Sequence, residues 1–217
     1  MRTKTRSVRV PKLIVILAAI TVTAAIALSN RAGNFERVAG STLTTDTIAS
    51  QPDPEKAKAA FTDAAKVFFS ARCANCHPAG DIPTQGDAMT PHTQGVTRGK
   101  TGLGVYGMKC ATCHQRENLD GDHKPPGTSK DWKMPPASSP MVFQGLTEGQ
   151  LCRNFNDPSK NGGHRTLREA MEHIQKKDPL VMWGWEPGNG RTIPPMSFEE
   201  FSAKVEEWVA NGGACPK

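Results

Sequence analysis

Apolar residues recur at helical spacing in four segments of the chain, and each segment begins with a residue suited to cap a helix. The first begins at Asp53 and Pro54 and leads to Cys73. The other three begin with the capping-box pairs Thr147 and Gln150, Thr166 and Glu169, and Ser197 and Glu200. The pattern predicts helices over 53–72, after Thr147, from Thr166 until Pro179 stops it, and over 197–211. We expect the first and last of these helices to pack against each other.

Between these segments the chain is rich in Gly, Pro and Thr, which disfavours long helices and strands. The longest such stretch, 78–109, reads as a loop that wraps around something. Residues 30–52 are rich in Ser, Thr, Gly and Ala and read as a linker. The expected fold is therefore mainly α with long loops, in one small domain over 53–217.

The N-terminus has the composition of an export signal. "MRTKTRSVRVPK" carries five basic residues and no acidic one, and it precedes sixteen uncharged residues. Residues 1–29 therefore form either a cleaved signal peptide or a retained membrane anchor, and the sequence leaves both open. Without these residues 22 of the 27 basic residues remain against 21 acidic ones. An almost neutral exported part gives no support to nucleic-acid binding.

The pattern Cys-x-x-Cys-His occurs twice, as "CANCH" from Cys73 and "CATCH" from Cys110. Two cysteines three apart can form thioethers with one haem, and the adjoining histidine then becomes the proximal iron ligand. This chemistry predicts two covalently bound c-type haems. Zinc bound by four thiolates would not explain the histidine after each pair. A thioredoxin-like redox pair is disfavoured because no strand-helix-strand pattern surrounds either motif. The predicted cofactor-binding residues are Cys73, Cys76, Cys110 and Cys113, with His77 and His114 as proximal ligands.

These motifs, the helix leading into Cys73 and the final "MSFEEFSAKVEEWVANGGACP" resemble c-type cytochromes. The exported part also resembles di-haem cytochromes encoded beside molybdenum hydroxylases of the isoquinoline oxidoreductase type. The resemblance implies a cytochrome c-like fold with two haems in one domain. It also implies periplasmic electron transfer to redox protein partners, as a shuttle or as the electron-exit subunit of an oxidoreductase. A second haem replaces the single distal loop of the mono-haem pattern, so the distal methionine rule does not transfer whole.

The sixth iron ligands are sorted by reach along the chain. His92 lies fifteen residues after His77, which predicts that it serves the first haem, with Met89 as the alternative. For the second haem the prediction is Met134 in "WKMPP", with His123 also within reach. Three residues are weaker candidates: His164, His173 and Met196.

Two cysteines remain outside the motifs, Cys152 and Cys215, and in an oxidising compartment they predict one disulfide. Two alternatives to electron transfer stay open, a di-haem peroxidase and a haem-based ligand sensor. Both would need one haem iron with an open coordination position.

Overall fold

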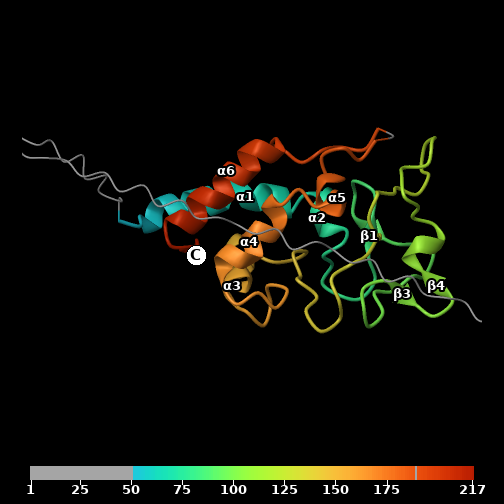
Figure 1. The fold of residues 1–217 in the computed structure, drawn as a ribbon, viewed down its shortest axis with the longest axis horizontal. Coiled ribbons are helices and arrows are strands. Elements are labelled where there is room, and N and C mark those ends of the chain that lie inside the picture. Colours follow the sequence, from blue (N-terminus) through green and yellow to red (C-terminus); the bar gives the residue numbers. More distant parts are fainter. Residues whose placement is uncertain (1–50, 189) are drawn as a thin grey trace, which may run out of the picture. The chain divides into compact units, whose positions relative to one another are not determined.

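Helices and long loops make up the described part of the chain, residues 51–188 and 190–217 of the computed structural model (Figure 1). The α-helices are α1 (Pro54–Phe68), α2 (Ala71–Ala74), α3 (Glu148–Asn156), α4 (Leu167–Gln175), α5 (Pro179–Met182) and α6 (Phe198–Ala210). Four two-residue strands, β1 (Thr84–Gln85), β2 (Thr90–Pro91), β3 (Gly104–Val105) and β4 (Met108–Lys109), precede the 3-10 helix η1 (Cys110–Thr112). The expectation of a mainly helical fold with long loops is confirmed.

The signal or anchor predicted over 1–29, and the linker up to residue 50, lie outside the described residues. Among the residues that are described, no helix has the length and apolar character needed to cross a membrane. The described residues all belong to one compact unit, Ile48–Lys217.

The helix starts follow the capping residues. The Asp53 carboxylate accepts hydrogen bonds from two backbone N–H groups of the first turn of α1. At α3, α4 and α6 the capping boxes led by Thr147, Thr166 and Ser197 are complete, because side chain and backbone bond reciprocally in each. The four helix starts predicted from the sequence are confirmed.

Pro179 does not have the role expected of it. Helix α4 already ends at Gln175, and Pro179 instead begins α5 behind the N-cap Asp178. Proline suits the first position of a helix, because its missing N–H would be unpaired there in any case.

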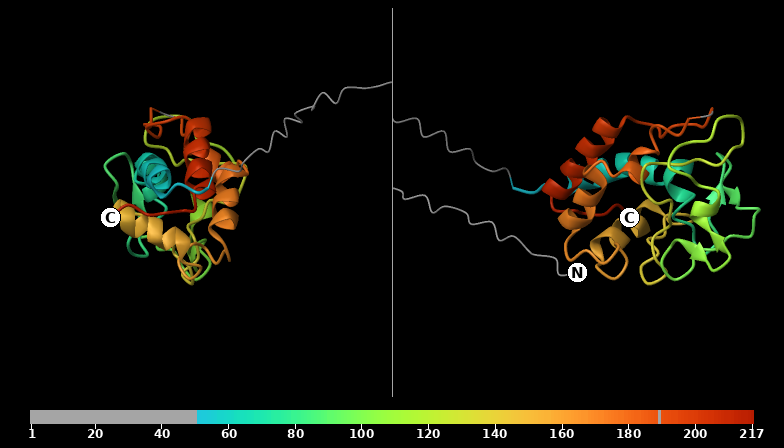
Figure 2. Two further views of the ribbon diagram at one scale, coloured as in Figure 1. Left: turned by 90° about the vertical axis from the view of Figure 1, so that its left-hand side faces the viewer. Right: turned by 45° about the vertical axis from the view of Figure 1, so that its right-hand side comes forward.

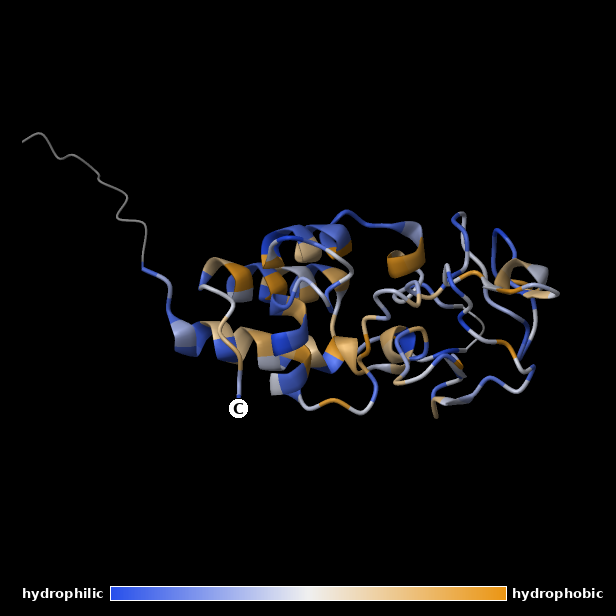
Figure 3. Cartoon of the chain, turned by 90° about the horizontal axis from the view of Figure 1, so that it is seen from below, coloured by the Kyte–Doolittle hydropathy of each residue, from blue (hydrophilic) through white to orange (hydrophobic). Residues whose placement is uncertain are grey.

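Helices α1 and α6 lie side by side, as the sequence predicted (Figures 1 and 2). The Phe61 ring packs against the Trp208 ring with centroids 4.6 Å apart, and both side chains are fully buried. Phe155 of α3 contacts both rings, so three helices share one aromatic core. Figure 3 shows hydrophobic and hydrophilic residues alternating around these helices, as in helices with one buried face.

The Gly- and Pro-rich stretch between the two motifs contains two small antiparallel hairpins, which the sequence analysis did not foresee. Strands β1 and β2 pair with Thr84 opposite Pro91, and β3 and β4 pair with Gly104 opposite Lys109. Strands of two residues are too short to show an alternating pattern in the sequence.

The disulfide predicted between Cys152 and Cys215 is present, with Cα atoms 5.5 Å apart. It joins α3 to the chain that follows α6. The Asn156 amide strengthens this connection by donating a hydrogen bond to the carbonyl of Gly213 at 3.0 Å.

Removing the cap of α6 is expected to lower the free energy of unfolding. The Ser197 hydroxyl accepts from the backbone N–H of Glu200, so Ser197→Ala leaves that group without its partner. We expect a loss of about 1 kcal/mol, measured by chemical denaturation. Ser202→Ala makes the same change inside α6 and should not destabilise the protein, because alanine favours a helix interior. Equal losses in both variants would contradict the capping role.

Candidate functional site

Each of the two Cys-x-x-Cys-His motifs forms its own single helical turn. In the first, α2 supplies Cys73 and the backbone N–H of Cys76 donates to the carbonyl of Cys73 at 3.1 Å. In the second, η1 begins at Cys110 and the backbone N–H of Cys113 donates to its carbonyl at 3.2 Å. Side chains three positions apart on such a turn project from one face. Each pair of sulfur atoms can therefore address one flat ligand.

The four motif cysteines are free thiols. Burial raises the pKa of Cys73 to about 12 and that of Cys76 to about 11, and the neighbouring Cys110 adds to the effect on Cys76. Both thiols are therefore protonated at neutral pH and are not activated nucleophiles.

His77 is held in an orientation suited to a metal ligand. Its Nδ1 lies 2.7 Å from the carbonyl oxygen of Met141, which can only accept a hydrogen bond, so Nδ1 carries the proton. Its ring stacks on Phe143, with centroids 3.9 Å apart and planes 5° apart. Burial lowers the pKa of His77 to about 4, so the ring is neutral. The lone pair on Nε2 is then available for a metal.

His114 repeats this arrangement in the second motif. Its Nδ1 donates to the carbonyl oxygen of Pro126 at 2.7 Å, and its ring stacks on Trp132 at 4.5 Å with planes 1° apart. Burial lowers its pKa as well. In each motif histidine, Nδ1 is thus hydrogen-bonded to a backbone carbonyl, the ring is stacked on an aromatic side chain, and Nε2 stays free.

Aromatic and cationic side chains connect the two motifs. Trp132, stacked on His114, contacts Trp183 edge to face at 4.8 Å. The guanidinium of Arg72, the residue before Cys73, lies over the Trp183 ring at 5.8 Å. The two motifs therefore share one environment.

Two buried side-chain nitrogens in the described part of the chain have no hydrogen-bond partner, and both lie at the motifs. They are Arg72 Nε and His92 Nδ1. A buried polar nitrogen without a partner is costly, so such atoms indicate a missing ligand group. A guanidinium suits a haem propionate and an imidazole suits iron, so these two residues fit the haem reading.

The large apolar side chains that are exposed to solvent lie outside the α-helices of the described chain. Five of them fall within 82–119 of the sequence and one follows α5: Ile82, Val105, Tyr106, Met108, Leu119 and Ile193. The core around α1 and α6 contributes none of them. Exposed apolar groups of this kind suit contact with a large apolar cofactor or with a partner.

Met134 and Arg98 join the loops around the two motifs. Arg98, 1% exposed, donates to the carbonyls of Gly80 and Pro135. The backbone N–H of Met134 donates to the carbonyl of Gly102, and that carbonyl lies 3.8 Å from the sulfur of Cys110. Met134 is 4% exposed and stands apart from the helical core.

The other ligand candidates occupy different places. The ring of His92 lies 6.3 Å from that of His114. His123 is exposed and has a positive φ of 58°. His164 and His173 contact each other, with ring centroids 6.0 Å apart. Met196 packs against the helical core.

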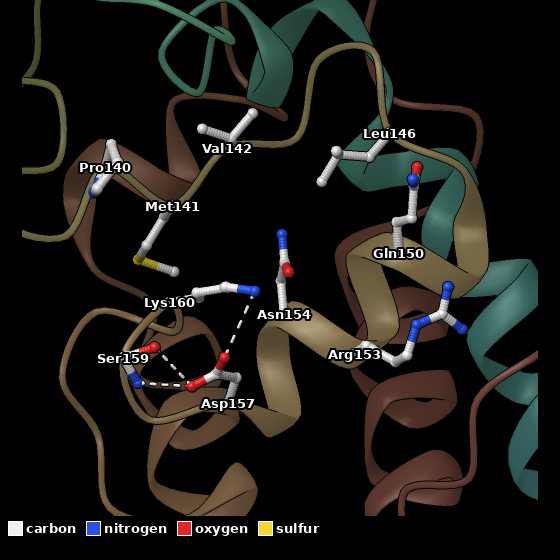
Figure 4. A pocket seen from close by; sticks show the side chains of 10 residues that line it. All are labelled: Pro140, Met141, Val142, Leu146, Gln150, Arg153, Asn154, Asp157, Ser159 and Lys160. Carbon is white, nitrogen blue, oxygen red and sulfur yellow. Dashed lines mark hydrogen bonds and ion pairs between the residues drawn. The ribbon is translucent and has the colours of Figure 1, made fainter.

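A pocket of about 610 Å³ in the described part of the chain does not contain the motifs. It lies between α3 and the segment 140–146, and Figure 4 shows Lys160 and Ser159 directed at the Asp157 carboxylate within it. Met141 lines this pocket with its side chain and binds His77 through its carbonyl. The pocket therefore borders the first motif without including any of its cysteines or its histidine.

In the part of the chain that the structure describes, no three or more His, Cys, Asp or Glu side chains gather as a metal site. Comparison of the chain with family models, curated proteins and solved structures found no match. The function is therefore inferred from the geometry of the two motifs.

Proposed function

We propose that this protein binds two c-type haems covalently and transfers electrons. The observation that carries the proposal is the matched state of His77 and His114. Each holds its Nδ1–H on a backbone carbonyl and its ring against an aromatic side chain, which leaves Nε2 free. Metal-bound histidines have this second hydrogen bond in most proteins, because it fixes the tautomer and the ring orientation.

Each haem would supply one-electron chemistry, its iron cycling between the ferric and ferrous states. The chain's own residues hold the ligands and set the surroundings. Phe143 and Trp132 restrict the two histidine rings, and Arg72 offers a buried positive charge. One electron enters from a reduced protein partner and leaves to an oxidised one, so the protein itself is unchanged after each cycle.

A cytochrome c-like fold, an export signal and a location outside the cytoplasmic membrane form part of this proposal. The partners would be redox proteins, and the sequence resemblance suggests a molybdenum hydroxylase among them. Attachment to the membrane depends on whether residues 1–29 are retained. The adjacency of the two motifs supports electron exchange within one domain.

The optical spectrum of the purified exported protein tests the proposal. We expect two covalently bound haems per chain by the pyridine haemochrome assay, and sharp low-spin bands on reduction. A high-spin component would favour the peroxidase or the sensor, because both need an open iron position. A protein without a Soret band that contains zinc would reject the haem reading.

A further inference from the structure

His92 faces the histidine of the second motif. The ring centroids of His92 and His114 are 6.3 Å apart and the ring planes are inclined by 63°. The two residues are 22 positions apart, and His92 follows strand β2. A ring contact without a hydrogen bond between two half-buried nitrogen-bearing rings calls for an explanation.

The separation of the two rings is the one expected for two imidazoles on opposite sides of a metal. A metal–imidazole nitrogen bond is about 2.0 Å long, and the ring centroid lies roughly 1.1 Å beyond the nitrogen, which gives roughly 6.2 Å between centroids. The inclination of 63° adds no restriction, because each ring can rotate about its own bond to the metal. The measured 6.3 Å agrees with this arrangement.

The hydrogen bonds of the two rings also leave one nitrogen of each ring available to a metal. His114 uses Nδ1 on the carbonyl of Pro126, which leaves Nε2 as its free nitrogen. The Nδ1 of His92 is buried and has no hydrogen-bond partner. Each ring therefore has one nitrogen that no described protein group binds.

The first motif fixes the position of His92. Asn75, inside the first motif, accepts the backbone N–H of Thr84 on its carbonyl and the Thr84 hydroxyl on its side-chain oxygen. Arg72 forms an ion pair with Asp87 in the turn of the same hairpin. The backbone N–H of His92 then donates to the carbonyl of Pro83 at 2.9 Å. The hairpin that starts at the first motif thus presents His92 to the second.

We infer that His92 is the sixth ligand of the haem attached at Cys110 and Cys113, opposite His114. The inference rests on the proposed function and deepens it. It differs from the assignment by chain reach, which gave His92 to the first haem. A histidine in this place closes the second iron to small ligands, and it favours a lower reduction potential than a methionine would.

Met134 and His123 are the competing residues for the second haem. His123 is exposed, so it lacks the fixed position of a ligand. Met134 is buried, and its chain neighbour Pro135 is bound by Arg98, which also binds Gly80 three residues after His77. With His92 assigned to the second haem, Met134 becomes the sulfur candidate for the first.

The test is His92→Ala in the full exported protein with both haems attached. We expect one of the two haems to become high-spin in the ferric optical and electron paramagnetic resonance spectra, and added imidazole to restore the low-spin signal. Met134→Leu, which conserves volume, is the matched control in the variant that retains only the haem at Cys110 and Cys113, where it should leave that haem low-spin. In the two-haem protein it should affect only the first haem. Single-haem variants identify which haem responds, since His92→Ala should act only where Cys110 and Cys113 are retained.

Near-infrared magnetic circular dichroism of the unmodified protein gives a second measurement that needs no folding of a variant. It should contain the charge-transfer band of a bis-histidine haem, and its absence would overturn the assignment. Two low-spin haems that survive His92→Ala would also overturn it while leaving the proposed function intact. A wild-type protein with no covalent haem would instead reject the proposed function itself.

Discussion

Replacing Cys110 and Cys113 by alanine is expected to reduce the covalent haem content from two per chain to one. The two sulfur atoms lie on one turn around η1 and have no other covalent partner, since the described disulfide uses different cysteines. Replacing Cys73 and Cys76 as well should abolish attachment. Intact mass under denaturing conditions measures this directly, because thioether-bound haem stays on the chain when the fold is lost.

The matched control changes the two cysteines that are already paired. In Cys152→Ala with Cys215→Ala, both haems should remain attached, because that bridge lies between α3 and the tail after α6. Haem that persists on the four-cysteine variant would show attachment elsewhere. Haem lost from the control would show that the effect comes from misfolding and not from the missing thioethers.

A single-haem protein would also separate electron transfer from the alternatives. One single-haem variant lacks Cys110 and Cys113, and the other lacks Cys73 and Cys76. If each haem is closed by two protein ligands, neither of these variants should bind carbon monoxide or consume peroxide appreciably. Under the proposed function, His114 and His92, whose rings are in contact, would bind the two sides of the second haem. A peroxidase or a gas sensor needs one side to be open, so the placement of His92 argues against both at this haem.

Much of the helical part of the fold could be predicted from the sequence. Helix starts depend on hydrogen bonds between residues that are close in the sequence. Asp53 alone caps α1, and the pair Ser197 and Glu200 caps α6. Two predicted helix ends were wrong. The helix predicted over 53–72 ends at Phe68, and a separate short helix, α2, carries Cys73. Helix α4 ends before Pro179, because a proline is as well suited to begin a helix as to stop one. The disulfide followed from counting the cysteines of a chain whose N-terminus predicts export.

The placement of His92 could not be predicted in the same way. The number of residues between a candidate ligand and a motif limits which haem the candidate can contact. It does not decide the matter, because loops of equal length can lead to either haem. The position is decided by long-range bonds, namely Asn75 to Thr84 and Arg72 to Asp87, and no spacing in the sequence shows them. A signal did exist: the histidine stands directly after a turn-rich stretch that begins at the first motif.

Removing the disulfide is the second change for which we expect a large effect. The bridge spans 63 positions, and closing a loop of that size stabilises a fold by about 4 kcal/mol in the chain-entropy model. Alanine at both positions is preferable to serine, because Cys152 is fully buried and a hydroxyl there would lack a partner. Chemical denaturation of the double variant should therefore show a free energy of unfolding lower by about that amount.

The tail should nevertheless stay docked without the bridge, so this loss should appear in stability and not in structure. Asn156 still binds the carbonyl of Gly213, and the Trp208 indole N–H donates to the carbonyl of Ala214 at 3.1 Å. Gly149→Ala tests the same docking separately, because its added Cβ would lie 2.6 Å from the carbonyl oxygen of Pro216. That variant should lose stability with the disulfide intact and keep both haems. If the double-alanine variant unfolded at the same denaturant concentration as the wild type, these contacts alone would suffice, and the disulfide would have no stabilising role.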